Sequence, residues 1–239
     1  MSDKRDDGTI RVWDLPTRLF KWTLVALVIF QVVSGKMAGH SDLTAVWLPR
    51  HRWCGYAILT LLIFRILWGL VGSTTARFSG FVKGPFAGLH HVRALLGSGP
   101  PREAGHNAVG GWMVIALILA LLVQVGSGLF TEDDLGMGDG GPLIGAASES
   151  WVKRMTSLHH WWINLIYILV ALHVLAAVLY LIVKKQDLIV PMITGRKKRN
   201  DVVAPGEPSP PLHFTANPLA LGCLLVSAAI VFAIMRIWG

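Results

Sequence analysis

The chain has too few charged residues for a protein that folds in water. Only 15% of its 239 residues are Asp, Glu, Lys or Arg, whereas 53% are hydrophobic, and the mean hydropathy is +0.54. A soluble domain carries about 25% charged residues, so the missing polar surface indicates a lipid environment. This composition argues against soluble enzymes, secreted disulfide-stabilised domains and nucleic-acid-binding proteins, and no nucleic acid is expected as a partner.

Cysteine is also scarce, and its two copies indicate no metal or redox centre. Cys54 and Cys223 both lie within apolar runs. The sequence has no C-x-x-C-H segment for covalent haem attachment and no Cys/His cluster with zinc-site spacing. Both thiols are therefore interpreted as buried apolar side chains. The first nineteen residues hold no short apolar core with a cleavage site, so we expect no removable signal peptide.

Five apolar stretches are long enough to cross a bilayer, which takes about 20 helical residues. Backbone polar groups in hydrocarbon must pair within their own segment, so each stretch is expected to be a helix. The expected spans are residues 19–35, 53–71, 111–130, 161–183 and 218–237. The predicted fold class is an all-α integral membrane protein, with a four-helix bundle over residues 1–195, a basic, Pro-rich linker over 196–216 and an additional transmembrane helix over 217–239.

Lysine and arginine are distributed unevenly between the two sides of this topology. One side holds the N-terminal segment with the second and fourth loops, and its cations are Lys4, Arg5, Arg11, Arg18, Lys21, Arg77, Lys83, Arg93, Arg102, Lys184, Lys185, Arg196, Lys197, Lys198 and Arg199. The other side has only Lys36, Arg50, Arg52, Lys153, Arg154 and Arg236. Because cytoplasmic loops are rich in Lys and Arg, the N-terminus is expected in the cytoplasm and the protein in a bacterial inner membrane.

Two cytoplasmic segments are expected to meet lipid headgroups or water. The basic, Pro-rich linker is interpreted as a solvated segment that could bind anionic headgroups. Apolar residues at near-helical spacing after Pro85 predict a short interfacial helix over residues 86–96.

Histidines within the spans are the most informative polar residues, since ionisable groups at membrane depth are costly. His159 and His173 are fourteen residues apart, so they share one helix face and lie roughly 21 Å apart along the axis. His160 points elsewhere. A single histidine is more often a polar group at a helix contact, but this pair, together with His51, favours ligands of a cofactor. Neutral imidazole is a haem-iron ligand, and helical bundles hold cofactors between facing helices.

Depth in the membrane suggests how these ligands pair. His51 opens the second span and His159 opens the fourth on the same outer side, so one haem could be clamped between them. His173 lies near the inner leaflet. On the first span, Lys21 is the only ionisable ligand candidate at that depth.

Several ordered segments resemble the prokaryotic cytochrome b561 family, which includes the cytochrome b subunits of nickel–iron hydrogenases. The segments are R-V-W-D-L-P-T-R-L-F-K-W at 11–22, H-R-W-C-G-Y at 51–56, F-R-I-L-W-G at 64–69, G-H-N-A-V-G-G-W at 105–112, and L-H at 158–159 followed by His173. The resemblance covers about residues 10–195. It implies two b-type haems stacked across the membrane, outer-haem ligands at His51 and His159, and an inner-haem ligand at His173.

The chain departs from that family at one ligand position. Where the family's first helix reads Leu-Phe-His-Trp, this chain has Lys21. A lysine amine binds iron only when neutral, which desolvation favours. Alternatively, His173 could hold the inner haem alone while Lys21 extends to the interface. The inner haem could also be lost, or held by another histidine such as His106.

Arg65 and several glycines are further candidates for contact with haem. Arg65 follows His51 by fourteen residues, so its guanidinium could pair with a haem propionate, or it could reach the inner headgroups instead. Glycine lets a flat porphyrin approach a helix backbone, although close helix packing explains it as well. The glycines in question are Gly35, Gly55, Gly69, Gly110, Gly111, Gly126 and Gly128.

The leading functional hypothesis is transmembrane electron transfer between a quinone and a periplasmic cytochrome or another redox partner. No catalytic nucleophile–base pair is identifiable. Lys36, Arg50 and Arg52 form a basic patch beside the expected outer haem, which supports a superoxide:quinone oxidoreductase as an alternative. A membrane-anchor subunit for a hydrogenase or dehydrogenase is a second alternative, and the fifth helix could serve such a complex or a homodimer.

Overall fold

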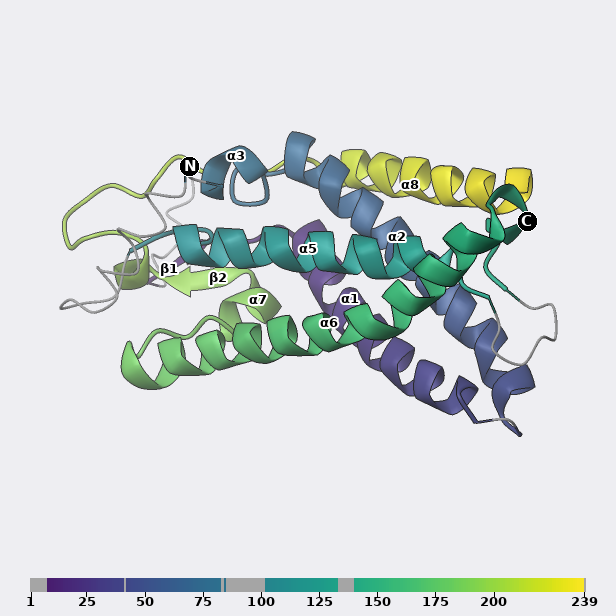
Figure 1. Cartoon of the computed structure of the whole chain (residues 1–239). Coiled ribbons are helices and arrows are strands. Elements are labelled where there is room, and N and C mark those ends of the chain that lie inside the picture. The colour runs from purple at the N-terminus through teal and green to yellow at the C-terminus, as the bar shows by residue number, and fades with distance from the viewer. Residues whose placement is uncertain (1–7, 41, 83, 85–101, 133–139, 239) are drawn as a thin grey trace. The chain divides into compact units, whose positions relative to one another are not determined.

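The computed structural model describes residues 8–40, 42–82, 84, 102–132 and 140–238, and most of them are helical (Figure 1). Its long helices are α1 (Leu15–Ala38), α2 (Thr44–Val71), α5 (Ala108–Gly128), α6 (Glu149–Val183) and α8 (Asn217–Trp238). Its short elements are β1 (Thr9–Arg11), α3 (Phe78–Phe81), η1 (Ile144–Ala146), α7 (Val190–Thr194), β2 (Arg196–Lys198) and η2 (Arg199–Asp201). The expected interfacial helix over residues 86–96 lies outside the described residues.

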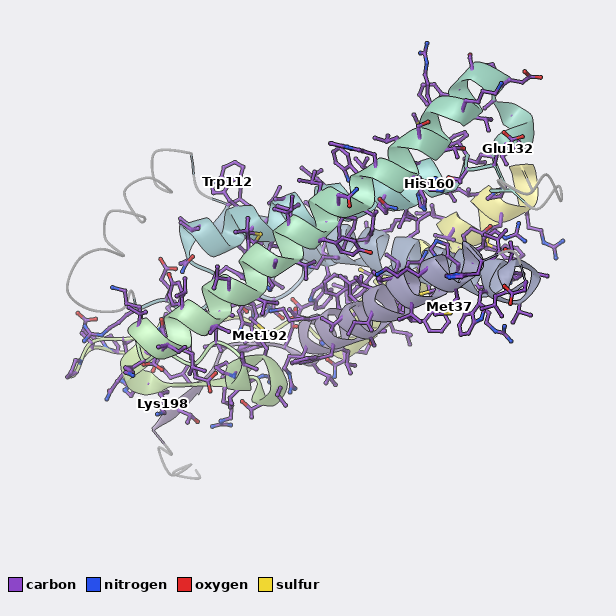
Figure 2. The ribbon with its side chains drawn as sticks, turned by 60° about the horizontal axis from the view of Figure 1, so that its bottom comes forward. Met37, Trp112, Glu132, His160, Met192 and Lys198 are labelled. Carbon is purple, nitrogen blue, oxygen red and sulfur yellow. The ribbon has the colours of Figure 1, made fainter. Side chains whose placement is uncertain are left out.

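All five long helices are long and apolar enough to cross a membrane, which confirms the five predicted spans. Much of their apolar surface faces outward: Leu19 is 58% exposed, Ile29 61% and Trp161 64%. Figure 2 shows the outward side chains of the helices mainly as carbon. An apolar surface of this extent is typical of contact with lipid. The chain is therefore an all-α, multi-pass membrane protein.

α1, α2, α5 and α6 begin earlier than the predicted spans, and polar residues stabilise the first turns of α1 and α6. The buried carboxylate of Asp14 accepts the Thr17 backbone N–H at 2.8 Å, which satisfies an amide that the first turn of α1 leaves unpaired. The other carboxylate oxygen accepts the Trp68 indole N–H at 3.1 Å. α6 carries Glu149 in its first turn, where a negative charge favours the start of a helix.

The chain forms two compact units, to which α1, α2, α5 and α6 each contribute. The first unit comprises Met1–Arg18, Leu67–Ile115 and Val170–Asn217. The second comprises Leu19–Ile66, Ala116–Leu169 and Pro218–Gly239.

In the first unit, the basic segment after α6 differs from the expected solvated linker. β2 pairs antiparallel with β1, with Thr9 opposite Lys198. Val202 and Val203 pack with Val12 and Trp13 in a small core. The buried Lys197 amine donates to the Glu103 carbonyl oxygen at 2.9 Å. Burial lowers the pKa of Lys197, while the nearby Asp201 and Glu103 carboxylates oppose that shift.

In the second unit, residues from α2, α5, α6 and α8 form one hydrophobic core. Its buried members include Ile58, Leu62, Leu121, Ile166 and Val231. The Trp162 indole N–H donates to the Ala120 carbonyl oxygen at 2.9 Å, which connects α6 to α5. Cys54 belongs to this core, and both cysteines are free and buried, as the sequence predicts. α8 is thus packed against the same core as the other helices of this unit.

Candidate functional site

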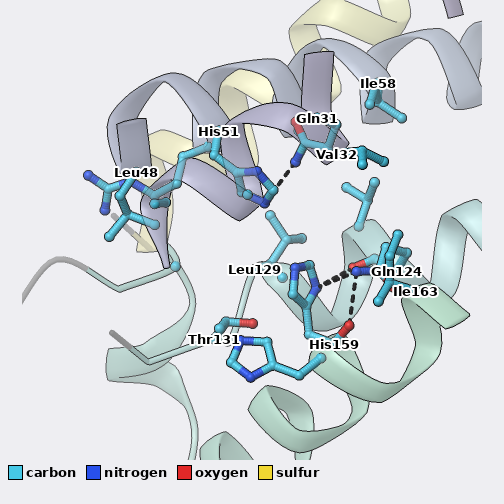
Figure 3. A pocket seen from close by; sticks show the side chains of 18 of the residues that line it. Gln31, Val32, Leu48, His51, Ile58, Gln124, Leu129, Thr131, His159 and Ile163 are labelled. Atoms are coloured by element: carbon cyan, nitrogen blue, oxygen red, sulfur yellow. Dashed lines mark hydrogen bonds between the residues drawn. The ribbon is translucent and has the colours of Figure 1, made fainter. Parts of the chain in front are cut away.

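The second unit contains a cavity of about 610 Å³ between its helices, and two histidines line it. His51 projects from α2 and His159 from α6, and their rings lie toward one another across the cavity (Figure 3). The ring centroids are 6.2 Å apart and the ring planes cross at 86°. Ligand sites of about 300–1,000 Å³ are usual in proteins. The structure therefore brings together the two histidines proposed as outer-haem ligands, in a space of suitable size.

His51 is held by side chains of α1. Its Nδ1 lies 3.2 Å from the Ser34 hydroxyl oxygen, and that hydroxyl donates to the Gln31 carbonyl oxygen at 3.2 Å. Because the hydroxyl proton is used there, Nδ1 is the donor toward Ser34. The Gln31 side-chain amide donates to His51 Nε2 at 3.0 Å. His51 is thus the neutral tautomer with its lone pair on Nε2.

His159 is held in a corresponding way by α5. Its Nδ1 donates to the Gln124 carbonyl oxygen at 2.9 Å, and the Ser127 hydroxyl oxygen lies 3.3 Å from the same nitrogen. The Ser127 hydroxyl in turn donates to the Gln124 carbonyl at 2.9 Å. Since a carbonyl only accepts, Nδ1 carries the proton and Nε2 carries the lone pair. A hydrogen-bond acceptor at Nδ1 fixes both the tautomer and the ring orientation of a histidine that binds metal through Nε2.

A glycine lies against each imidazole. A Cβ atom at Gly35 would lie 3.0 Å from His51 Cε1, and one at Gly128 would lie 2.9 Å from His159 Cε1. Both distances are too short for an ordinary contact between carbon atoms, which prefer about 3.5–4.0 Å. These two glycines therefore give the imidazoles room, whereas a Cβ at Gly126 would meet nothing within 4 Å.

The haem implied by the resemblance fits this site. Two imidazoles face a common space of about 610 Å³, and the glycines beside them leave room for the rings. The remaining lining is largely apolar and includes Val28, Ile58, Leu121, Val125 and Ile163. Ligation at His51 would require the Gln31 amide to leave Nε2, which its flexible side chain allows. His51 and His159 would hold the iron.

Charged and polar side chains also line the cavity. They include Lys36, Arg52, Glu132 and His160, of which Figure 2 labels Glu132 and His160. Arg52 donates to the Gly140 carbonyl oxygen at 2.7 Å. Arg50 belongs to a different environment, since it donates to the Val46 carbonyl and lies over the Trp47 ring. Of the predicted basic patch, Lys36 and Arg52 thus line the cavity.

The other predicted ligands are divided between the two units. Lys21 and Arg65 belong to the second unit, whereas His173 belongs to the first. The pairing of Lys21 with His173 therefore stays a prediction. Arg65 is only 2% exposed, so the surrounding protein encloses it. His106 lies in the first unit, with its ring 4.8 Å from that of Trp13 and 4.9 Å from that of Phe81.

The sequence contains a signal for the histidine partners that our residue-by-residue reasoning missed. Residues 31–35 read Q-V-V-S-G and residues 124–128 read Q-V-G-S-G. In each segment, the Gln backbone and the Ser hydroxyl form the hydrogen bonds described above, and the final glycine lies against the imidazole. We call these the two Q-V-x-S-G segments. The repeat marks both halves of the site.

Comparisons with known proteins place the chain among membrane cytochromes. A family profile described as prokaryotic cytochrome b561 matches residues 12–195. A protein from Bradyrhizobium diazoefficiens named "Probable Ni/Fe-hydrogenase B-type cytochrome subunit" is 25% identical over 230 residues, which covers 81% of this chain and 87% of that protein. No solved structure matches the chain significantly.

Proposed function

The chain belongs to the prokaryotic cytochrome b561 family, and on that premise we propose that it carries electrons across a membrane through two b-type haems. The family is one of b-type cytochromes, which implies haem b as the cofactor. The observation that carries the proposal is the pair His51 and His159, whose rings face each other 6.2 Å apart across the cavity.

The protein's own groups would orient one haem and isolate it from water. His51 and His159 would each offer Nε2, because their Nδ1 atoms face acceptors on α1 and α5. Apolar residues such as Leu121 and Ile163 would exclude water from its faces. Bound haem supplies a one-electron ferric/ferrous couple, and its potential depends on the axial ligands and their hydrogen bonds.

The proposal for the inner haem rests on the sequence. His173 and Lys21 would hold its iron, and the enclosed Arg65 would pair with a haem propionate. With ligands near both leaflets, an electron could pass from one side of the membrane to the other. We place the N-terminus in the cytoplasm, because the loops on the same side of the membrane as the N-terminus carry most of the Lys and Arg residues. The match to a prokaryotic family supports a bacterial inner membrane.

Two partner assignments have specific support. The Bradyrhizobium protein is named a hydrogenase cytochrome subunit, which favours a soluble oxidoreductase as the redox partner, with this chain as its membrane anchor and with quinone as the second partner. Lys36 and Arg52 line the cavity that holds His51 and His159, so an anion such as superoxide could be attracted there. Copurification with an oxidoreductase favours the anchor, whereas quinone reduction by superoxide with the isolated chain favours the alternative.

Electron transfer can be tested in liposomes that contain the purified protein and trapped ferricyanide. External dithionite cannot cross the bilayer, so ferricyanide is reduced only if the protein carries electrons inward. We expect rapid loss of ferricyanide absorbance with the wild type, and a rate close to that of protein-free liposomes with His51→Ala or His159→Ala. His213→Ala, which does not line the cavity, is the control and should keep the wild-type rate. Equal rates in all four proteins would contradict the proposal.

A further inference from the structure

The two Q-V-x-S-G segments place a serine in the same position beside each proposed haem ligand. Ser34 is 0% exposed and Ser127 is 3% exposed. Each hydroxyl donates to the carbonyl oxygen of the glutamine three residues earlier, Gln31 or Gln124. That bond uses the hydroxyl proton, so the lone pairs of each serine oxygen remain available to a second donor.

In both segments that second donor is the imidazole of the next long helix. The Ser34 oxygen lies 3.2 Å from His51 Nδ1, and the Ser127 oxygen lies 3.3 Å from His159 Nδ1. A serine in an apolar helix can donate its hydroxyl proton to a backbone carbonyl of the same helix. Ser227 does so, and donates to the Cys223 carbonyl oxygen at 2.7 Å. Ser34 and Ser127 make that bond and also contact a histidine.

We propose that Ser34 and Ser127 are positioning residues, one beside each imidazole, that lower the redox potential of the haem held by His51 and His159. This inference rests on the proposed function. A hydrogen bond accepted from Nδ1–H makes an imidazole a stronger electron donor to iron. Stronger donation favours the ferric state, so each serine should lower the midpoint potential.

The arrangement also predicts that the effect is larger at Ser34 than at Ser127. His159 Nδ1 already donates to the Gln124 carbonyl oxygen at 2.9 Å, and the Ser127 oxygen lies farther away, at 3.3 Å. The loss of Ser127 therefore removes the weaker of two acceptors.

The test is a potentiometric titration of Ser34→Ala, Ser127→Ala and the double variant, with Ser227→Ala as the matched control. Ser227 is also fully buried within the second unit and bonds to its own helix. Alanine is smaller than serine and favours helix, so these variants should fold. Thermal unfolding midpoints and haem content, measured on the same preparations, would verify that.

We expect Ser34→Ala to weaken the preference for ferric iron about threefold, which is about 28 mV in the upward direction at about 59 mV per tenfold change for one electron. Ser127→Ala should give a smaller upward shift, and the double variant should give the largest. Ser227→Ala should not move the potential. A change in the largest g value of the ferric EPR signal should accompany the shifts, because the imidazoles lose part of their orientation.

An unchanged potential in either serine variant would overturn the inference, as would a downward shift. These outcomes are distinct from a failure of the proposed function. That failure would appear as full haem binding by proteins in which His51 or His159 is replaced. If both histidines bind haem but the serines do not affect its potential, only the inference is wrong.

Discussion

Replacement of Gly128 by alanine should remove most of the haem held by His51 and His159. The added Cβ atom would lie 2.9 Å from His159 Cε1, and close packing leaves little room for the ring to retreat. The imidazole would have to turn, which would break its bond to the Gln124 carbonyl. Loss of a hydrogen-bond partner of a metal-binding histidine typically weakens metal binding roughly 10–100-fold. The ratio of haem to protein after purification measures the effect.

Gly126→Ala is the matched control for this prediction. It lies on the same helix, and a Cβ atom there would meet nothing within 4 Å. Alanine is better than glycine in a helix by about 0.8–1.0 kcal/mol, so α5 itself should not be weakened. Gly35→Ala should resemble Gly128→Ala, because its Cβ would lie 3.0 Å from His51 Cε1. Equal haem retention at positions 126 and 128 would show that the close approach is irrelevant to binding.

Replacement of Lys21 by alanine should leave the inner haem with one protein ligand. If the Lys21 amine binds iron opposite His173, its loss opens one axial position, and about half of the bound haem should become five-coordinate. Reduced Lys21→Ala protein should then bind carbon monoxide, which an optical difference spectrum detects. The haem held by His51 and His159 should keep its wild-type spectrum.

Lys21→His is the variant that separates ligation from a structural role of the lysine. An imidazole at this position should restore a six-coordinate inner haem and should also shift its potential, because the axial ligand has changed. His173→Ala should affect the same haem as Lys21→Ala. If neither Lys21 variant changes the inner-haem spectrum, Lys21 is not a ligand, and the inner site must be assigned again.

The sequence predicted the five membrane helices well because lipid imposes a simple rule on them. An apolar stretch of sufficient length must pair its backbone internally, so composition alone indicates a helix. The helix starts were less predictable. Hydropathy averages over a window and ignores a single carboxylate such as Asp14, although that group caps α1 and so places its first turn. The polar first turns of α6 were missed for the same reason.

The histidines of the site were easier to predict than their partners. An ionisable residue at membrane depth is unusual in itself, so the sequence alone identifies His51 and His159 as candidate ligands, without any knowledge of packing. Ser34 and Ser127 are small, and in an apolar helix such residues usually indicate close packing. Their contacts with imidazoles cross from one helix to another, and only the three-dimensional arrangement shows them. The repeated Q-V-x-S-G pattern was the available signal.

The pairing of β1 with β2 was beyond local sequence reasoning. Each strand has three residues, and β2 consists entirely of cations. Nothing in such a short charged segment predicts that it pairs with residues 9–11, which are far away in the sequence. The strands are fixed by contacts outside them, through the small core of Val12, Trp13, Val202 and Val203.

EPR spectroscopy of the oxidised protein can show whether His51 and His159 hold one haem between them. Imidazole planes that cross at 86° predict a strongly anisotropic low-spin ferric signal, with its largest g value well above that of a haem with parallel imidazoles. His51→Ala and His159→Ala should each abolish this signal, whereas His213→Ala, which lies outside the cavity, should retain it. The same low-spin signal at full intensity in either of the first two variants would mean that these histidines do not hold the haem.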